Sequence, residues 1–473
     1  MKYFTGMIRL RTAYEKGEKT LMEREKLGSR LGFILLSAGC AIGIGNVWKF
    51  PYVAGQNGGA IFILIYLFFL VVLGIPVMTM EFSMGRAAKR SCAKMYDQLE
   101  PAGSKWHIHS KFAVAGNYLL MMFYTVVAGW MLKYFVDMST GAFDISSPQK
   151  VAAHFTEMNQ DPWSLVLYMA IVVVIGFGIC ALGLQNGLER ITKWMMGALL
   201  AIMVVLAVNS VFLEGASEGL QFYLMPSLER FNEAGAMNVI VAAMNQAFFT
   251  LSLGIGAMAI FGSYIDKDRA LMGESVNVAL LDTFVAITAG LIIIPACFAY
   301  NVEVSAGPSL IFITLPNLFH NMPLGRLWGS LFFVFMSFAA LSTVLAVFEN
   351  IISSTMDQFG WSRKKACAIN LILVFILSLP CALGFNVLEN IAPLGEGSTI
   401  MDLEDFLVSN ILLPAGSLIF VLFCTWKQGW GWDAFVQEAN TGKGLKVRPW
   451  MKNYCRYILP AIIVVVLLIG LIG

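Results

Sequence analysis

Two short stretches of this sequence place groups that can bind a ligand inside runs that are otherwise apolar. The first, GCAIGIGNVWKFP at residues 39–51, holds three glycines, an asparagine and a proline. The second, NQAFFTLSLGIGAMAIFGSY at residues 245–264, holds Thr250, Ser252 and several glycines. A broken helix exposes backbone N–H and C=O groups that lipid cannot satisfy. We therefore predict that both helices are interrupted where their backbones bind something.

The chemistry available at such a break is the binding of a cation and of a carboxylate. Carbonyl oxygens at the C-terminal end of a half-helix suit a hard cation, and N–H groups at the N-terminal end of the other half suit a carboxylate. Glycine lets the backbone approach the ligand closely. The alternative is that the glycines form a face for helix packing. We favour a site for a zwitterion together with a cation.

The elements that carry these residues are apolar segments long enough to cross a bilayer. Of the 473 residues, 58% are hydrophobic and 13% are charged, which is too little charge for the surface of a soluble protein. Apolar runs of about 20 residues match a bilayer core of ~30 Å. We expect an all-α polytopic membrane protein with eleven transmembrane helices, at about residues 30–53, 58–84, 112–136, 163–184, 189–213, 237–264, 274–300, 328–356, 366–384, 400–425 and 453–473.

Ten of these segments divide into two sets of five. Residues 30–213 would form the first repeat and residues 237–425 the second, and each repeat opens with one of the interrupted segments. Because five is odd, the two sets would insert with opposite orientation, followed by one extra helix at 453–473. Paired interruptions at matching positions in two halves point to the substrate site of a transporter.

Positive charge lies in alternate loops and predicts the orientation. Residues 1–29 are polar and basic and lack the apolar core of a signal peptide, so we expect a cytoplasmic N-terminal tail. An odd number of spans then places the C-terminus outside the cell, in a multi-pass protein of the inner membrane. The basic residues of the other alternate loops include Arg86, Lys89, Arg90, Arg190, Lys193, Lys267, Arg269, Arg363, Lys364, Lys365, Lys443, Lys446 and Arg448.

Other kinds of chemistry find little support. The eight cysteines lack metal-binding spacing, and we expect Cys40, Cys180, Cys297 and Cys424 to be small helix-packing residues. A net charge of +2 gives no reason to expect a nucleic-acid partner. A ligand-gated channel would need a continuous polar pore, whereas the polar residues here converge on a closed site at mid-membrane. We expect no enzyme, because the four histidines should lie in loops without forming a catalytic cluster, namely His107, His109, His154 and His320.

Four stretches resemble the neurotransmitter:sodium symporter family, and within it the bacterial amino-acid transporters that have eleven helices. RLGFILLSAGCAIGIGNVWKFPYVAGQNGGAIF resembles the first helix, GIPVMTMEFSMGR the second, QAFFTLSLGIG the sixth, and GPSLIFITLPNLF the outer loop before the eighth. The resemblance runs from about Arg24 to the end. It implies a leucine-transporter-type fold with two inverted five-helix repeats plus one extra helix.

The resemblance also implies two sodium sites. The first would use the Ala41 carbonyl, Asn46, Thr250 and Asp282, with the substrate carboxylate as a further ligand. The second would use the carbonyls of Gly39, Ile42 and Ala339 with the hydroxyls of Ser342 and Thr343. Oxygen ligands are the ones a hard cation prefers.

The substrate pocket that the resemblance implies lies between the two breaks. Tyr124 would donate a hydrogen bond to the substrate carboxylate and would form an aromatic lid with Phe249. The pocket would be lined by Cys40, Ala41, Gly43, Ile44, Gly45, Leu120, Tyr124, Phe249, Thr250, Ser252, Ile255, Thr343 and Val347.

Two gates follow from the same resemblance. Lys49 and Asp405, with Gln246, would form the outer gate, and a lysine there lacks the planar fork of the arginine that relatives often have. The inner gate would be formed by Arg24, Asp357, Ser263 and Tyr264.

Two buried glutamates and two departures from the family also need an explanation. Glu81 should bond the unwound backbone of the sixth segment, while the sequence gives no partner for Glu349. Leu27 stands where many relatives have a tryptophan. Many relatives also have a proline ten residues after a glycine at the start of helix five, linked to release of the second sodium; here Gly187 is followed by Gly197.

Together these features predict a sodium-coupled symporter of neutral, hydrophobic or aromatic amino acids that works by alternating access. Relatives that favour leucine have Phe at Ile255 and Ile at Val347, so the pocket should be larger, although Leu120 narrows it slightly. The expected partners are an amino acid and membrane lipid, and the oligomeric state stays open. Three alternatives also stay open. They are a transporter of the same fold for another small zwitterion or amine, a different coupling ion, and a transport-like sensor.

We further expect chloride-independent transport. Animal members of the family bind chloride with a serine of helix seven and an asparagine four residues before it, where this chain has Ala286 and Asp282. The carboxylate of Asp282 would repel chloride at a desolvated site, and Ala286 offers no hydroxyl donor.

Overall fold

The computed structural model describes residues 25–145, 147–300 and 309–472. Regular structure in these ranges is helical, apart from one isolated bridge between Arg269 and Lys443. The apolar segments in the described ranges therefore form helices, as predicted. Arg24, which the sequence assigns to the inner gate, lies outside the described residues.

Nine helical stretches in the described ranges are long and apolar enough to cross a membrane. Five are single helices: α7 (Ile108–Thr140), α9 (Pro162–Ala181), α15 (Leu271–Ala299), α17 (Gly325–Phe359) and α18 (Arg363–Leu383). The other four contain a π-helical turn: α4-η2-α5 (Ala60–Phe69, Leu70–Gly74, Ile75–Ala88), η3-α10 (Leu184–Glu189, Arg190–Val211), α19-η5-α20 (Ile400–Phe406, Leu407–Leu412, Leu413–Thr425) and α22-η6-α23 (Met451–Asn453, Tyr454–Ile458, Leu459–Ile472).

Both segments that the sequence marks as interrupted are broken. Helix α2 (Arg30–Ala41) is followed by η1 (Gly45–Lys49) and α3 (Phe50–Gln56), and the two halves are bent by 60°. Helix α13 (Ala236–Phe249) is separated from α14 (Ala257–Tyr264) by seven non-helical residues, 250–256. Counting the first pair as one span gives ten spans, and neither α13 nor α14 is long enough to cross alone. The predicted count of eleven is therefore approached but not reached by length alone.

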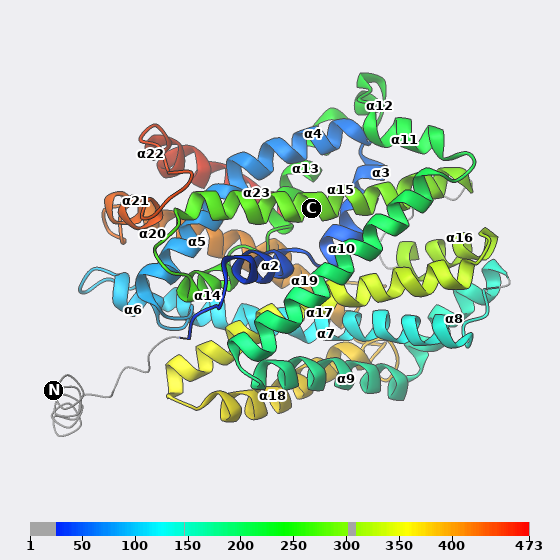
Figure 1. Cartoon of the computed structure of the whole chain (residues 1–473), viewed down its shortest axis with the longest axis horizontal. Helices are drawn as coiled ribbons and strands as arrows, with labels where there is room; N and C mark the ends of the chain where they lie inside the picture. Colours follow the sequence, from blue (N-terminus) through cyan, green and yellow to red (C-terminus); the bar gives the residue numbers. More distant parts are fainter. Residues whose placement is uncertain (1–24, 146, 301–308, 473) are drawn as a thin grey trace.

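The remaining helices lie at the two ends of the molecule. Helices α8 (Pro148–Gln160), α11 (Ala216–Leu224), α12 (Leu228–Glu233) and α16 (Leu315–Asn321) gather at the right-hand end of Figure 1, where η4 (Leu310–Thr314) precedes α16. Helices α6 (Met95–Leu99) and α21 (Trp432–Ala439) lie at the left-hand end. The described chain enters from the left in Figure 1, so the N-terminal end of α2 faces the end that carries α6 and α21.

The broken helix α2 lies in the middle of the molecule. Helices α7 and α17 pack along each other, with α9 and α18 against them, while α2 packs against α10, α14, α15 and α17. The last residues of α2 are buried, including Gly39, Cys40 and Ala41. The carbonyls that α2 leaves without helical partners are thus held inside the protein.

The structure locates the histidines and cysteines, for which the sequence makes specific predictions. The prediction that all four histidines lie in loops is wrong for three of them, because His109, His154 and His320 lie in α7, α8 and α16. Helix α7 begins before the apolar run at 112–136, and α8 and α16 are short helices between the apolar runs, where the sequence suggests loops. All eight cysteines are buried and free of disulfides, as expected for packing residues. No group of three or more His, Cys, Asp or Glu in the described ranges could hold a metal.

Candidate substrate and ion site

The break after α2 leaves Ile42 and Gly43 outside any helix. The Gly43 amide donates to Asn46 Oδ1 at 3.3 Å, and the Ile44 amide donates to the Tyr124 hydroxyl of α7 at 3.0 Å. A Cβ atom on Gly43 would lie 2.4 Å from the Tyr124 hydroxyl and 2.8 Å from Thr343 Oγ1. This position therefore requires glycine, because Tyr124 and Thr343 approach the unwound backbone from two helices.

The second break, at residues 250–256, depends on left-handed backbone conformations. Gly254 and Gly256 have φ of 109° and 73°, which glycine adopts without steric cost, and Ser252 has φ of 50°. Glu81 of α5 is fully buried, and its Oε1 accepts a hydrogen bond from the Gly254 amide at 2.6 Å. The prediction that Glu81 bonds the unwound backbone of this segment is confirmed.

Three of the residues predicted for the first sodium form one hydrogen-bonded cluster. The Asn46 amide donates to Asp282 Oδ1 at 2.7 Å and to Thr250 Oγ1 at 3.2 Å, and the Thr250 hydroxyl donates to Asp282 Oδ2 at 3.0 Å. These three side chains come from η1, the end of α13 and α15, and each is at most 2% exposed. The cluster holds a carboxylate among neutral partners, which is an arrangement that a cation would neutralise.

The residues predicted for the second sodium also meet. On α17, the Ser342 hydroxyl lies 2.8 Å from the Ala339 carbonyl and 3.3 Å from that of Ile42. The Thr343 hydroxyl lies 3.2 Å from the Gly39 carbonyl and 3.3 Å from that of Ile42. Since each hydroxyl carries one proton, two protons serve a cluster of five oxygens. Such an electron-rich set suits a hard cation.

The remaining pocket residues surround the same two breaks. A Cβ atom on Gly45 would lie 2.8 Å from the Phe249 ring, and the Ser252 hydroxyl lies 3.5 Å from the Cys40 carbonyl. Ile255 packs against Gly116 of α7. The predicted apolar lining residues Leu120, Ile255 and Val347 are 8%, 1% and 0% exposed.

The ion pair predicted for the outer gate is not formed among the described residues. Lys49 is exposed, and its ammonium lies 4.2 Å from the centre of the Phe249 ring. Asp405 instead accepts a hydrogen bond from the Ser409 hydroxyl at 2.7 Å. Gln246 donates weakly to the Gly45 carbonyl at 3.4 Å. The lysine ammonium is a compact charge that can bind to the face of an aromatic ring. It lacks the planar guanidinium of arginine, which can donate two parallel hydrogen bonds to one carboxylate.

The predicted inner-gate residues lie at the end of the molecule where α2 begins. Asp357 accepts from the Arg90 guanidinium at 3.2 Å and from the Ser91 amide at 2.7 Å. Ser263 and Tyr264 end α14 and are buried. The Ser263 hydroxyl donates to the Ile260 carbonyl, and the Tyr264 hydroxyl donates to Glu349.

The partner of Glu349, which the sequence leaves open, is Arg363. The Arg363 guanidinium donates to both Glu349 oxygens, at 2.7 and 2.9 Å, and also to Glu25, at 3.1 and 3.2 Å. Glu349 is fully buried, so a bidentate pair compensates its charge. A signal existed in the sequence, because a buried glutamate needs a cation and Arg363 opens the next helix.

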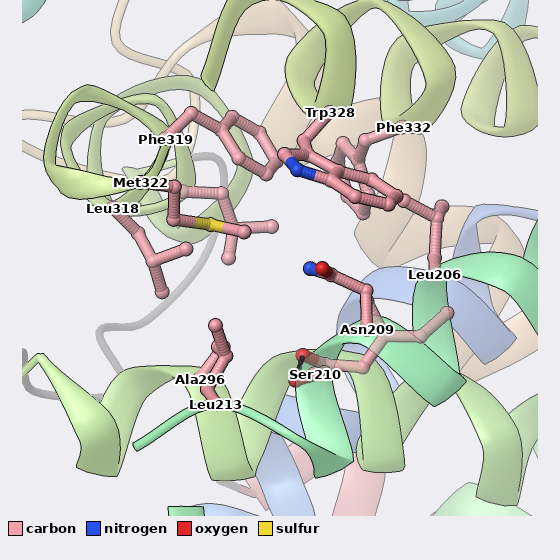
Figure 2. Close-up of a pocket in the computed structure, with 12 residues that line it drawn as sticks. Leu206, Asn209, Ser210, Leu213, Ala296, Leu318, Phe319, Met322, Trp328 and Phe332 are labelled. Carbon is pink, nitrogen blue, oxygen red and sulfur yellow. Dashed lines mark hydrogen bonds between the residues drawn. The ribbon is translucent and has the colours of Figure 1, made fainter. Parts of the chain in front are cut away.

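One further hollow lies away from this site. Figure 2 shows a cavity between α10, α15, α16 and α17, lined mainly by apolar side chains, into which the Asn209 amide points. Its volume is about 20 Å³, and the neighbouring Ser210 hydroxyl is bonded to the Ile292 carbonyl at 2.6 Å. None of its lining residues belongs to the predicted site. A volume of this size holds about one water molecule.

Comparisons with known proteins show the family of this chain. A family model described as the sodium:neurotransmitter symporter family matches residues 24–151 and 149–473. An uncharacterized sodium-dependent transporter of Bacillus subtilis is 33% identical over 446 residues, which cover 94% of this chain and 97% of that protein. The sodium- and chloride-dependent GABA transporter 2 of Bos taurus is 24% identical, over 96% of this chain and 81% of that protein.

A solved structure extends the likeness to the whole fold. The crystal structure of MhsT in complex with L-phenylalanine matches with a TM-score of 0.83 and 38% identity, over 95% of this chain and all of that one. The family consists of transporters, and the helices of this chain are those of a multi-pass membrane protein. This chain therefore belongs to the sodium:neurotransmitter symporter family and is a sodium-dependent symporter with the leucine-transporter-type fold.

Proposed function

We propose that this protein carries neutral, hydrophobic or aromatic amino acids into the cell together with sodium, at two sodium sites, by alternating access. The observation that carries the proposal is the meeting of Asn46, Thr250 and Asp282 at the break of α2, next to a second cluster of carbonyl and hydroxyl oxygens. A sodium gradient and the membrane potential would drive uptake; each charge gains about 2.3 kcal/mol per 100 mV.

The substrate carboxylate would bind beside Tyr124. The Tyr124 hydroxyl accepts a hydrogen bond from the Ile44 amide, so its own proton remains for donation to an anionic ligand. The same carboxylate would complete the ligand set of the first sodium, together with the Ala41 carbonyl at the end of α2. This shared ligand is the physical basis for coupling: neither ion nor substrate has a full set of partners alone.

A hydrophobic substrate is supported by the apolar side of the pocket and by the likeness to MhsT. Ile255 and Val347 are buried and smaller than the residues of relatives that favour leucine. MhsT was solved with L-phenylalanine. We therefore take L-phenylalanine as the first substrate to test, with leucine and glycine as comparisons.

Chloride would not be needed. Asp282 supplies a fixed negative charge within the first cation cluster, and Ala286, one turn further along α15, has no hydrogen-bond donor in its side chain. The protein would lie in the inner membrane with its N-terminus in the cytoplasm. The end of the molecule that carries α6 and α21 would then face the cytoplasm.

The experiment that tests the proposed function is uptake into proteoliposomes. An inward sodium gradient should drive accumulation of radiolabelled L-phenylalanine above its equilibrium level, and collapse of the gradient with a sodium ionophore should release it. A sensor would bind the amino acid without accumulating it. Accumulation that is the same with a potassium gradient would contradict sodium coupling.

A further inference from the structure

The N-terminus of α2 is held by a carboxylate from another helix. Glu189 ends the π-helical turn η3 and is 3% exposed. Its Oε2 accepts from the Gly28 amide at 2.7 Å, and its Oε1 accepts from the Ser29 hydroxyl at 2.9 Å. Ser29 is the residue that caps α2. The carboxylate thus joins η3, directly before α10, to the two residues that precede α2.

The surrounding residues are fitted to this contact. A Cβ atom on Gly32 would lie 2.1 Å from Glu189 Oε1, so the glycine makes room for the carboxylate. The Lys193 ammonium, one turn along α10, lies 2.6 Å from Glu189 Oε1 and 2.7 Å from the Ser29 hydroxyl. A Cβ atom on Gly187 would lie 2.2 Å from the Ile179 carbonyl, which fixes the π-helical turn against α9.

The same face of α10 covers the second cation cluster. Met196 Sδ and Thr192 Cγ2 lie 3.5 and 3.6 Å from the position of a Cβ atom on Gly39, whose carbonyl belongs to that cluster. Thr192 is 1% exposed, and its hydroxyl has no hydrogen-bond partner among the described residues. A buried hydroxyl of this kind gains a partner as soon as water enters. Separation of α2 from α10 would therefore hydrate the cluster directly.

We propose that Glu189 is a positioning residue that controls release of the second sodium by holding α2 against α10. The proposal rests on the proposed function and deepens it. By the resemblance, Gly197 stands where many relatives have a proline in helix five, so the release route linked to that proline lacks the proline here. In this chain the element that sets when α2 and α10 part is the π-helical turn with Glu189 at its end.

A second glutamate near the same helix end provides a matched control. Glu274 of α15 pairs with the Arg30 guanidinium at 3.0 Å, but the Arg30 side chain is 47% exposed. The pair involves no backbone amide of α2, and α15 carries Asp282 of the first cluster, not the second. Glu274→Gln removes a carboxylate of the same kind without loosening α2 from α10, so its effect on sodium release should be small.

The test compares Glu189→Gln, Glu189→Ala and Glu274→Gln in the purified full-length protein. The sodium concentration for half-maximal L-phenylalanine binding should rise about tenfold in Glu189→Ala and less in Glu189→Gln, which keeps one acceptor oxygen. L-Phenylalanine affinity at saturating sodium should stay within about twofold of wild type, because sodium then holds α2 in place. A general loss of structure would weaken both quantities together.

A thiol-labelling experiment measures the separation of α2 from α10 independently. Thr192→Cys places a thiol at the cover of the second cluster, while the eight native cysteines are buried. In sodium its reaction with a small charged thiol reagent should be slow, and Glu189→Gln should accelerate it about tenfold while Glu274→Gln does not. Unchanged labelling and unchanged sodium dependence in both Glu189 variants would overturn the proposal. If wild-type binding needs no sodium, the proposed function itself fails.

Discussion

Asp282 is the carboxylate of the candidate first sodium site, and its hydrogen-bond partners Asn46 and Thr250 are neutral. Resemblance to the family identifies these three residues from the sequence, because their types match a motif. Resemblance does not show that they meet. The distances between these three side chains depend on how η1, the end of α13 and α15 pack together. Motifs in a single sequence do not reveal that packing.

The first prediction concerns chloride. Sodium-driven uptake of L-phenylalanine by the wild-type protein should be equal in chloride and in gluconate, because Asp282 supplies the negative charge that chloride would otherwise supply. The double variant Asp282→Asn, Ala286→Ser should be slow in gluconate and stimulated by chloride, since it gains a hydroxyl donor and loses the carboxylate. A strong chloride requirement in the wild type would show that this assignment is wrong.

The second prediction concerns substrate size. Ile255 is buried against Gly116, so the larger side chain of Ile255→Phe should reduce the volume left for the substrate side chain. Competition assays should show the preference moving from L-phenylalanine towards smaller side chains by about 10–200-fold, the range that one methylene is worth in an apolar pocket. Leu281→Phe, on α15 outside the predicted pocket, is the control for added volume. Unchanged selectivity in Ile255→Phe would remove this residue from the pocket.

At the level of elements, the sequence predicts the two broken helices well and the π-helical turns not at all. Glycines, hydroxyls and an asparagine at 39–46 and 250–256 mark the breaks, because each of these residues weakens a lipid-buried helix. A π-helical turn such as η3 or η5 differs from its neighbours by one shifted hydrogen bond, so composition and periodicity hardly change. Such turns depend on packing and often occur at functional sites.

The third prediction tests how closely the elements approach at the first break. Gly43→Ala should abolish L-phenylalanine binding, since the added methyl would lie 2.4 Å from the Tyr124 hydroxyl. Gly197→Ala in α10 is the matched control, because no atom lies within 4 Å of its added methyl. It should retain binding and raise the unfolding temperature slightly, as alanine is favoured over glycine in a helix by about 1 kcal/mol. Similar behaviour of both variants would contradict the geometry of the break.

The fourth prediction concerns the support of the second break. Glu81→Leu removes the acceptor of the Gly254 amide and should cost about 1–3 kcal/mol of stability, with weaker substrate binding. Glu81→Gln keeps an acceptor oxygen and should lose clearly less of both. Thermal unfolding with and without L-phenylalanine measures the two effects. Equal losses in the two variants would mean that the hydrogen bond to Gly254 does not hold the segment.

On the scale of the whole molecule, the two ends of the pathway differ. At the end where α2 begins, Glu349, Arg363, Tyr264 and Glu25 form one bonded network, and Glu189 holds the two residues that precede α2. At the other end, Lys49 is exposed over Phe249 and is not paired with Asp405. Among the described residues, the charged groups near the start of α2 are therefore paired, whereas the predicted outer pair is not formed.

The fold class and the candidate site residues follow from the sequence, while the ion pairs and hydrogen bonds near the start of α2 do not. The pairing of Glu349 with Arg363 joins residues on either side of the short turn between α17 and α18. The contact of Glu189 with Gly28 joins residues 161 positions apart. Both depend on tertiary packing of helices whose apolar faces look alike in sequence. The position of Lys49 depends on packing in the same way, because its ammonium lies over the Phe249 ring and not beside Asp405.

The most direct test of the account is L-phenylalanine binding to the purified protein, measured by calorimetry in sodium chloride and in N-methyl-D-glucamine chloride. Because the substrate carboxylate would complete the first sodium site, affinity should fall at least about tenfold without sodium. By linkage, L-phenylalanine should tighten sodium binding by the same factor. Equal affinity for L-phenylalanine in the two salts would contradict the central claim that one site binds the amino acid and the ion together.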